Sequence, residues 1–139
     1  MFNQAILITI LTISVVSSKT VFAQSEEIDP AVVSAEMYKV ILDNQFVRVV
    51  DYQIPVGSKD NWHTHPAKAS YVVKGGKLKI TTDKGESFTV DEETGTASWF
   101  GAVGLHTAEN VGDTPVHIVL VEIKALGSSR GNASKYKRD

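Results

Sequence analysis

The stretch Asn61-Trp62-His63-Thr64-His65-Pro66 determines how the rest of this chain is interpreted. It holds two of the four histidines of the sequence, one residue apart. Because successive side chains on a β-strand point to opposite faces, His63 and His65 would lie on the same face, about 7 Å apart along the backbone. Two imidazoles on one face can bind one metal ion together. The stretch therefore predicts a metal site that needs a rigid wall and a third ligand from elsewhere.

The sequence around these histidines alternates between polar and apolar residues as short strands do. We expect about eight strands with turn residues every eight to twelve positions, a pattern typical of a β-sandwich or barrel. The connections are too short for the crossovers that parallel sheets need. The most continuously apolar strand is expected to be central. The expected strands fall within residues 38–42, 46–54, 62–65, 69–74, 77–82, 86–90, 96–100, 105–111 and 116–123.

The N-terminus has a different composition. Residues 5–16 form an uncharged, mostly apolar run, too short to span a bilayer but suited to the core of a signal peptide. Val21-Phe22-Ala23 follows, so we predict a signal peptide over residues 1–23 and a periplasmic or secreted protein that leaves the membrane after cleavage. No Lys or Arg precedes the run, which leaves an uncleaved anchor or a buried strand as alternatives.

The two segments that flank the expected strands are polar. Residues 24–37 are interpreted as a linker or a short helix over 31–37, with Asp29 as its cap and Pro30 at the first helical position. Residues 125–139 are interpreted as a disordered, basic tail. A length of 139 residues favours a single domain.

Composition argues against nucleic acid as a partner and excludes cysteine chemistry. The formal net charge of −2 gives no electrostatic reason to expect nucleic acid as a partner. The sequence contains no cysteine, so disulfides and thiolate ligands or nucleophiles are excluded.

The third ligand is expected to be His106, which lies 41 residues after His65 in another strand. The glycine-rich residues 101–104 precede it, and glycines there would let the backbone bend toward the first pair. Three neutral imidazoles suit a divalent transition metal such as Fe, Mn, Ni, Cu, Co or Zn better than magnesium or calcium.

With these residues in place, the chain resembles the cupin superfamily. The first cupin motif reads Gly, five residues, His, one residue, His, three or four residues, Glu, six residues, Gly. Four of its positions match, at Gly57, His63, His65 and Gly76, whereas the Glu position falls on Ala69, or on Ser70 with the longer spacing.

The second cupin motif is also present in part. Gly95, His106 and Asn110 match it, while Gly101 replaces its Pro and Val103 replaces its Gly. The resemblance implies an all-β fold, a double-stranded β-helix or jelly-roll barrel of about eight strands, as a cupin domain over residues 38–124. It also implies a homodimer, because cupins often pair.

The missing Glu implies a three-histidine site similar to those of cysteine dioxygenase and the diketone-cleaving dioxygenases. Such a site has positions open to water, oxygen or a chelating anion. The expected function is therefore metal-dependent oxidation of a small chelating molecule by an oxidase or dioxygenase. Two alternatives remain open: a non-catalytic cupin that binds or senses a small molecule or metal, and a sugar isomerase or epimerase.

Two further residues are candidates for catalysis. Tyr71 is in phase with Ala69 and could supply a pocket hydroxyl. Glu122 shares the face of Ile118 and Leu120, and could act as a ligand or as an acid or base if that face lines the barrel. The remaining expectations are Trp62 in the core or at the pocket rim, Lys68 solvated, Glu109 facing away from His106, and His117 structural or exposed.

Overall fold

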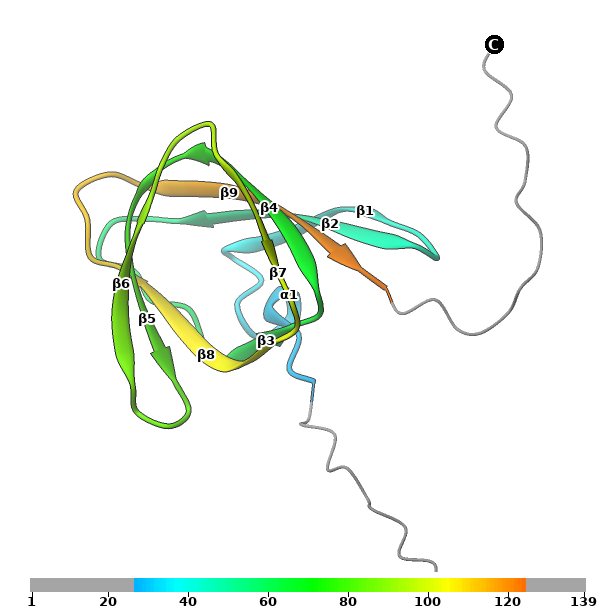
Figure 1. Ribbon diagram of the computed structural model, residues 1–139, viewed down its shortest axis with the longest axis horizontal. Helices are drawn as coiled ribbons and strands as arrows, with labels where there is room; N and C mark the ends of the chain where they lie inside the picture. The colour runs from blue at the N-terminus through cyan, green and yellow to red at the C-terminus, as the bar shows by residue number, and fades with distance from the viewer. Residues whose placement is uncertain (1–26, 125–139) are drawn as a thin grey trace, which may run out of the picture.

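The structure is a computed structural model that describes residues 27–124 (Figure 1). The predicted signal peptide and the predicted basic tail lie outside the described residues. One short helix and nine strands make up this part of the chain, and each strand overlaps one of the nine ranges expected from the sequence. They are α1 (Pro30–Val33), β1 (Tyr38–Asp43), β2 (Val47–Ile54), β3 (His63–His65), β4 (Lys68–Lys74), β5 (Gly76–Thr82), β6 (Ser87–Glu92), β7 (Ala97–Phe100), β8 (Val103–Asn110) and β9 (Val116–Ile123).

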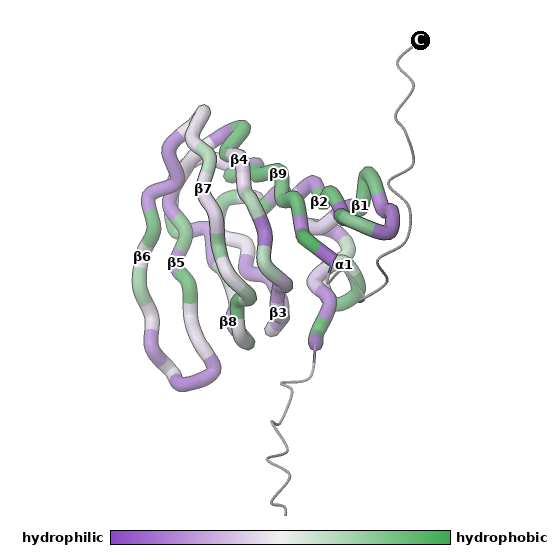
Figure 2. The backbone as a smooth tube through the Cα atoms, turned by 45° about the vertical axis from the view of Figure 1, so that its right-hand side comes forward, coloured by the Kyte–Doolittle hydropathy of each residue, from purple (hydrophilic) through white to green (hydrophobic). Residues whose placement is uncertain are grey.

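The strands form two antiparallel sheets that face each other across a barrel-like interior (Figure 1). One sheet has the order β1-β2-β9-β4-β7, and the other has the order β3-β8-β5-β6. The prediction of an all-β jelly roll is confirmed. The apolar strand β9 lies in the middle of the five-stranded sheet, between β2 and β4, so its predicted central position is also confirmed. Figure 2 shows hydrophobic segments concentrated along β9 and the strands beside it.

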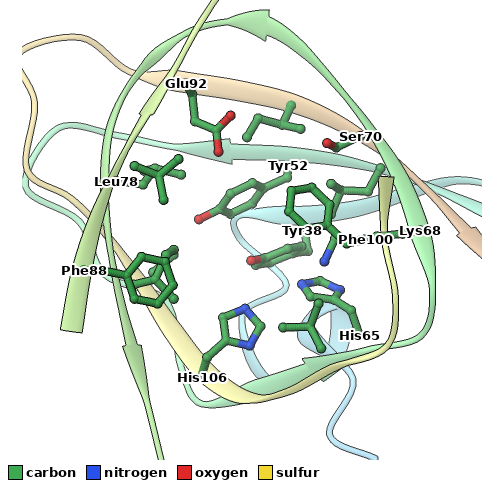
Figure 3. A pocket seen from close by; sticks show the side chains of 16 residues that line it. Tyr38, Tyr52, His65, Lys68, Ser70, Leu78, Phe88, Glu92, Phe100 and His106 are labelled. Carbon is green, nitrogen blue, oxygen red and sulfur yellow. The ribbon is translucent and has the colours of Figure 1, made fainter. Parts of the chain in front are cut away.

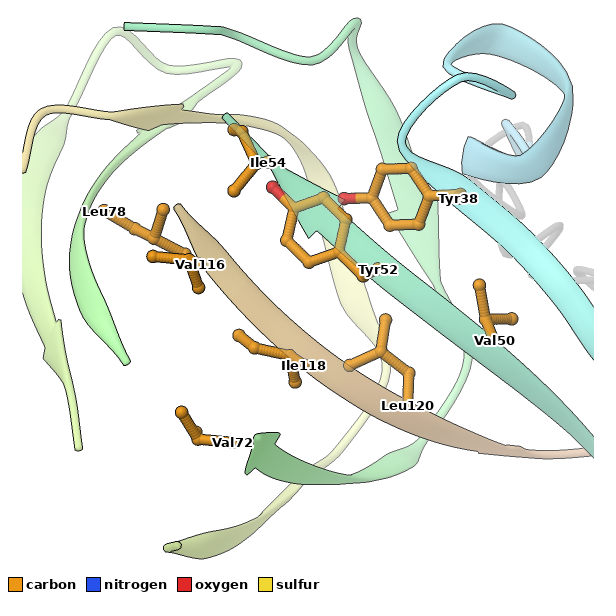
Figure 4. Packing of buried hydrophobic residues seen from close by; sticks show 9 residues of the cluster. All are labelled: Tyr38, Val50, Tyr52, Ile54, Val72, Leu78, Val116, Ile118 and Leu120. Carbon is orange, nitrogen blue, oxygen red and sulfur yellow. The ribbon is translucent and has the colours of Figure 1, made fainter. Parts of the chain in front are cut away.

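The hydrophobic core lies mainly on the inner face of the five-stranded sheet (Figure 4). Alternate residues of β9 point inward, and this row ends at Glu122, a buried carboxylate. The same alternation in β2 contributes Val50, Tyr52 and Ile54. The full cluster consists of Tyr38, Val50, Tyr52, Ile54, Val72, Leu78, Val116, Ile118 and Leu120.

Helix α1 is shorter than predicted. Asp29 caps it as expected, since its carboxylate accepts a hydrogen bond from the Ala31 N–H at 2.9 Å. The helix ends at Val33 because Ser34 leaves helical geometry, and the Ser34 hydroxyl accepts the Asn61 N–H at 2.9 Å. This contact fixes the N-terminal segment against the residues that lead into β3. No helix within residues 27–124 has the length and apolar character needed to cross a membrane.

The matched motif residue Asn110 holds loops together. Its buried side-chain amide donates to the carbonyls of Ile54 at 3.0 Å and Thr114 at 2.8 Å. Its oxygen accepts the Gly112 N–H at 3.0 Å. At Gly75, a Cβ atom would lie 2.0 Å from the backbone oxygen of Glu92, so only glycine fits there. The Asn110 hydrogen bonds hold the end of β2 against the end of β8 and the turn that follows it.

Candidate metal centre

The three predicted histidines lie together inside the barrel. Strand β3 pairs with β8, and His63 stands directly opposite His106. His63 and His65 are two residues apart and share the inner face of β3, and all three histidines are buried. One nitrogen of each ring lies within 4.8 Å of the others, a spacing that can hold a metal ion. The predicted proximity of the three histidines is confirmed.

Each histidine uses its Nδ1 atom for a hydrogen bond away from the cluster. His63 donates to the Asn61 carbonyl at 2.7 Å, and His106 donates to the Gly104 carbonyl at 2.8 Å. His65 donates to Oε1 of Glu122 at 2.9 Å. These acceptors select the tautomer in which Nε2 carries the lone pair. Metal-binding histidines have this arrangement, with Nδ1 held by a carbonyl or carboxylate and Nε2 free for the ion.

Burial favours the neutral form of two of these imidazoles, His65 and His106. It lowers the pKa of His65 to about 4, even though the hydrogen bond to Glu122 acts in the opposite direction. Burial also lowers the pKa of His106. At neutral pH the contact between His65 and Glu122 is therefore a hydrogen bond from a neutral ring. Neutral imidazoles with free lone pairs are what a transition metal requires, so the donor set fits such an ion.

Glu122 lies between His65 and a charged network. Its second oxygen accepts from Nε of Arg48 at 2.7 Å, and Arg48 also forms a two-point ion pair with Asp29. Burial alone would raise the pKa of Glu122, but the hydrogen bonds from His65 and Arg48 outweigh it and lower that pKa. Glu122 faces inward as predicted. Both of its oxygens are already hydrogen-bonded, so it orients His65 from behind.

A second buried carboxylate supports the other side of the cluster. Asp60 accepts hydrogen bonds from the hydroxyls of Tyr38 at 2.8 Å and Tyr52 at 3.2 Å, and from the Ala108 N–H at 2.6 Å. The Tyr38 oxygen also lies 3.2 Å from Nε2 of His63. Burial raises the pKa of both tyrosines, so their hydroxyls stay protonated. Because the Tyr38 hydroxyl donates its hydrogen bond to Asp60, the lone pair on Nε2 of His63 stays free.

The cluster borders a cavity of about 240 Å³ that is mostly apolar (Figure 3). His65 and His106 contribute to its wall, beside the rings of Tyr38 and Tyr52. Apolar side chains from both sheets form most of the rest, namely Leu78, Ile80, Phe88, Val90, Phe100, Val103, Ala108, Ile118 and Leu120. The cavity has the size and lining of a site for a small organic molecule.

The residues of β4 that were predicted to face the barrel interior face outward, and their neighbours face inward. Lys68, Ser70 and Val72 form its inner row, whereas Tyr71 is 50% exposed and does not line the cavity. The inward position that matches the cupin Glu is therefore Ser70. The proposed pocket hydroxyl of Tyr71 is a wrong prediction, because a shift of one residue moves a side chain to the other face of a strand.

Other expectations are corrected as well. Lys68 is buried in the cavity wall and is not solvated, and Trp62 is 42% exposed outside that wall. Gly101 and Gly104 have no positive φ, so the pairing of β8 with β3, rather than a glycine bend, positions His106. His117 contacts Asp51 at the partly exposed outer surface, in agreement with a structural role.

The sequence pattern did not identify Asp60, Arg48 or Tyr38 as part of the site. Asp60 lies between Gly57 and His63 of the first motif, at a position that the motif leaves free. Arg48 and Tyr38 belong to strands far from the histidines in sequence. Only the pairing of β2 with β9 and of β1 with β2 brings them to the cluster.

Comparisons with known proteins agree on the fold. No protein-family model and no curated protein matches the sequence. Among solved structures, a cupin domain from Bordetella pertussis Tohama I is similar, with 29% identity, a TM-score of 0.59, and coverage of 63% of this chain and 92% of that chain. An RmlC-like cupin family protein from Methanocaldococcus jannaschii has a double-stranded β-helix fold. It matches with 14% identity and a TM-score of 0.50, over 62% of this chain and 77% of that chain.

These likenesses and the two-sheet topology show that the chain has a cupin-like double-stranded β-helix fold, and the buried histidine cluster agrees with its resemblance to the cupins. The chain has a histidine cluster suited to a metal ion without the carboxylate ligand of the cupin motif.

Proposed function

We propose that this protein is a metal-binding cupin in which His63, His65 and His106 hold one divalent transition metal through their Nε2 atoms. The observation that supports this most directly is the set of three Nδ1 hydrogen bonds, which leave the other nitrogen of each ring free in a cluster whose ligand atoms lie within 4.8 Å of one another. An ordinary buried histidine needs no such common orientation. Fe, Mn, Ni, Cu, Co and Zn all suit three imidazoles.

We further propose that the site oxidises a small chelating substrate with dioxygen. A redox-active metal held by three neutral ligands would supply Lewis acidity, electrons and open coordination positions. The apolar cavity wall excludes water from the substrate. Glu122 and Asp60 keep the rings of His65 and Tyr38 in place. Ser70, at the inward position of the missing Glu, leaves one side of the centre open to a ligand.

Oxygen consumption tests the catalytic part of this proposal. Metal-free protein would be loaded separately with Fe²⁺, Mn²⁺, Ni²⁺, Cu²⁺, Co²⁺ or Zn²⁺ and given small hydroxy-ketones, diketones and thiol acids in an oxygen electrode. We expect consumption with at least one redox-active ion and none with Zn²⁺. Metal binding without oxygen consumption for every pair would favour the non-catalytic binding module. An oxygen-independent product would favour an isomerase or epimerase.

Export and pairing are proposals that rest on the sequence and on the cupin resemblance. We propose cleavage after Ala23, which gives a mature protein beginning at Gln24 in the periplasm or outside the cell, and we propose a homodimer. N-terminal sequencing of protein recovered from the exported fraction tests the first. Light scattering on the mature protein tests the second.

A further inference from the structure

Lys68 is a buried cation in the wall of the cavity. It opens the inner row of β4, stands opposite Phe100 of β7 and Glu122 of β9, and is only 7% exposed. Its Nζ atom lies 5.4 Å from the centre of the Phe100 ring. Figure 3 shows the amine pointing into the cavity on the side where His65 lies.

Within residues 27–124, no carboxylate forms an ion pair with Lys68. The nearest candidate across the sheet is Glu122, but its two oxygens are engaged by His65 and Arg48. Burial lowers the pKa of Lys68 to about 8, with the charge of Glu122 acting against that shift, so the amine is still mostly charged at neutral pH. A buried ammonium without a counter-ion is unfavourable. The burial of the Lys68 ammonium is explained if an anion from outside the protein serves as its counter-ion.

The rest of the cavity limits what this anion can be. Its volume of about 240 Å³ and its apolar walls fit a compact hydrocarbon body. Glu92 also lines the cavity. It pairs with Gly76 at the first residue of β5, whereas His106 pairs with Thr82 at the last residue of β5. A second negative charge at that end of the ligand would be repelled.

We propose that Lys68 is the anion-recognition residue of this cavity and that its ligand is a small organic monoanion, a carboxylate or enolate on a compact apolar body. The anionic group lies between the Lys68 ammonium and the histidine cluster. The part of the inference that places this group against a metal rests on the proposed function. The contacts of the ligand with Lys68 and with the apolar wall do not require the metal.

Calorimetry with benzoate tests the inference, with benzyl alcohol as a neutral probe of similar size. Both would be titrated into metal-free protein and into Zn²⁺-loaded protein, in which no redox turnover can occur. We expect Lys68→Met to weaken benzoate binding about tenfold to hundredfold, because a charge-assisted contact is lost, and to change benzyl alcohol binding less than twofold. Lys68→Arg keeps the charge and should retain benzoate binding within about tenfold.

A second measurement, thermal unfolding, needs no ligand. Because Lys68→Met removes an unpaired buried charge and leaves Glu122 with its two partners, the melting temperature of the ligand-free variant should rise by a few degrees. If Lys68→Met does not fold, Lys68→Gln serves in its place. Terephthalate should bind wild type at least tenfold more weakly than benzoate, and Glu92→Gln should narrow that difference.

The outcomes separate this inference from the metal proposal. Lys68-dependent benzoate binding in a protein that takes up no metal would leave the inference standing and refute the metal site. Stoichiometric metal uptake with equal benzoate affinity in wild type and Lys68→Met would overturn the inference alone. Absence of benzoate binding to wild type, or no preference for benzoate over benzyl alcohol, would also overturn it.

Discussion

Glu122 accepts a hydrogen bond from Nδ1 of His65 at 2.9 Å and, through its other oxygen, one from Arg48 at 2.7 Å. This carboxylate joins the histidine cluster to a charged network that reaches Asp29 at the start of α1. An acceptor behind a metal-binding histidine fixes the ring and raises its basicity. The strength of metal binding should therefore depend on a residue that does not touch the metal.

Glu122→Gln tests this dependence. The substitution keeps the size and one acceptor oxygen but removes the charge that polarises His65. We expect the affinity for Zn²⁺ to fall about tenfold to hundredfold, measured by competition with a chromophoric chelator. Asp51→Asn is the matched control, because Asp51 contacts the outer-surface His117 and should leave the affinity unchanged. Equal effects of the two substitutions would mean that Glu122 has no special role in the site.

The hydroxyls around Asp60 should contribute to stability. Tyr38 and Tyr52 both donate to the same oxygen of this buried carboxylate. We expect Tyr38→Phe and Tyr52→Phe each to lower the free energy of unfolding by about 1–3 kcal/mol in urea denaturation, because a buried charged acceptor loses a donor. Tyr71→Phe alters an exposed hydroxyl and should have almost no effect. A larger loss for Tyr71→Phe than for the other two would contradict this assignment.

Acid should destabilise the metal-free protein. The pKa of His65 is about 4 in the folded state and near its ordinary 6.5 in the unfolded chain. As pH falls below 6.5 the unfolded chain takes up the proton first, so the free energy of unfolding decreases down to about pH 4. His65 alone accounts for roughly 3 kcal/mol over this interval, and His106 acts in the same direction.

Urea denaturation between pH 7.5 and 4.5 measures this loss. His65→Gln should show a smaller slope with pH than wild type, whatever its overall stability. Zn²⁺-saturated wild type should be more stable than metal-free protein near pH 7, because the ion binds only the folded cluster strongly. Stability that is constant or increasing toward pH 4.5 in the metal-free protein would be inconsistent with neutral buried imidazoles.

Asn110 should be essential for loop packing rather than for chemistry. Its side chain makes three hydrogen bonds to backbone groups of residues 54, 112 and 114. Asn110→Ala is expected to lower the free energy of unfolding by about 3 kcal/mol in denaturant titration. The variant should still bind metal once folded, at temperatures well below its melting point. Loss of metal binding with unchanged stability would assign Asn110 to the site instead.

The alternation of polar and apolar residues along single strands predicted most of the fold. The inward row of β9 and the short strands between turns follow from local patterns that any antiparallel sheet with one buried face must satisfy. The histidine cluster was also predictable, because His63 and His65 share one strand face and His106 fits the second motif. These features depend on spacing within a segment or on a known motif.

Two features could not be predicted in the same way: which residues of β4 face inward, and which residues of other strands contact Glu122. The cupin spacing allows Ala69 or Ser70 at the Glu position, and the choice of Ala69 reversed both faces of β4. This error placed Tyr71 in the cavity and left Lys68 in solvent, where lysines usually lie. Glu122 was placed on the correct face, but its hydrogen bonds depend on residues of β2 and β3 that only the folded sheet brings near.

The metal content of the mature protein tests the central claim most directly. Protein purified without a histidine tag would be measured by elemental analysis beside His106→Ala and the matched variant His117→Ala, whose histidine lies on the outer surface. We predict about one transition-metal ion per chain in wild type and His117→Ala, and loss of that ion in folded His106→Ala. Equal metal content in His106→Ala and wild type, or no metal in wild type even after loading, would contradict the three-histidine centre.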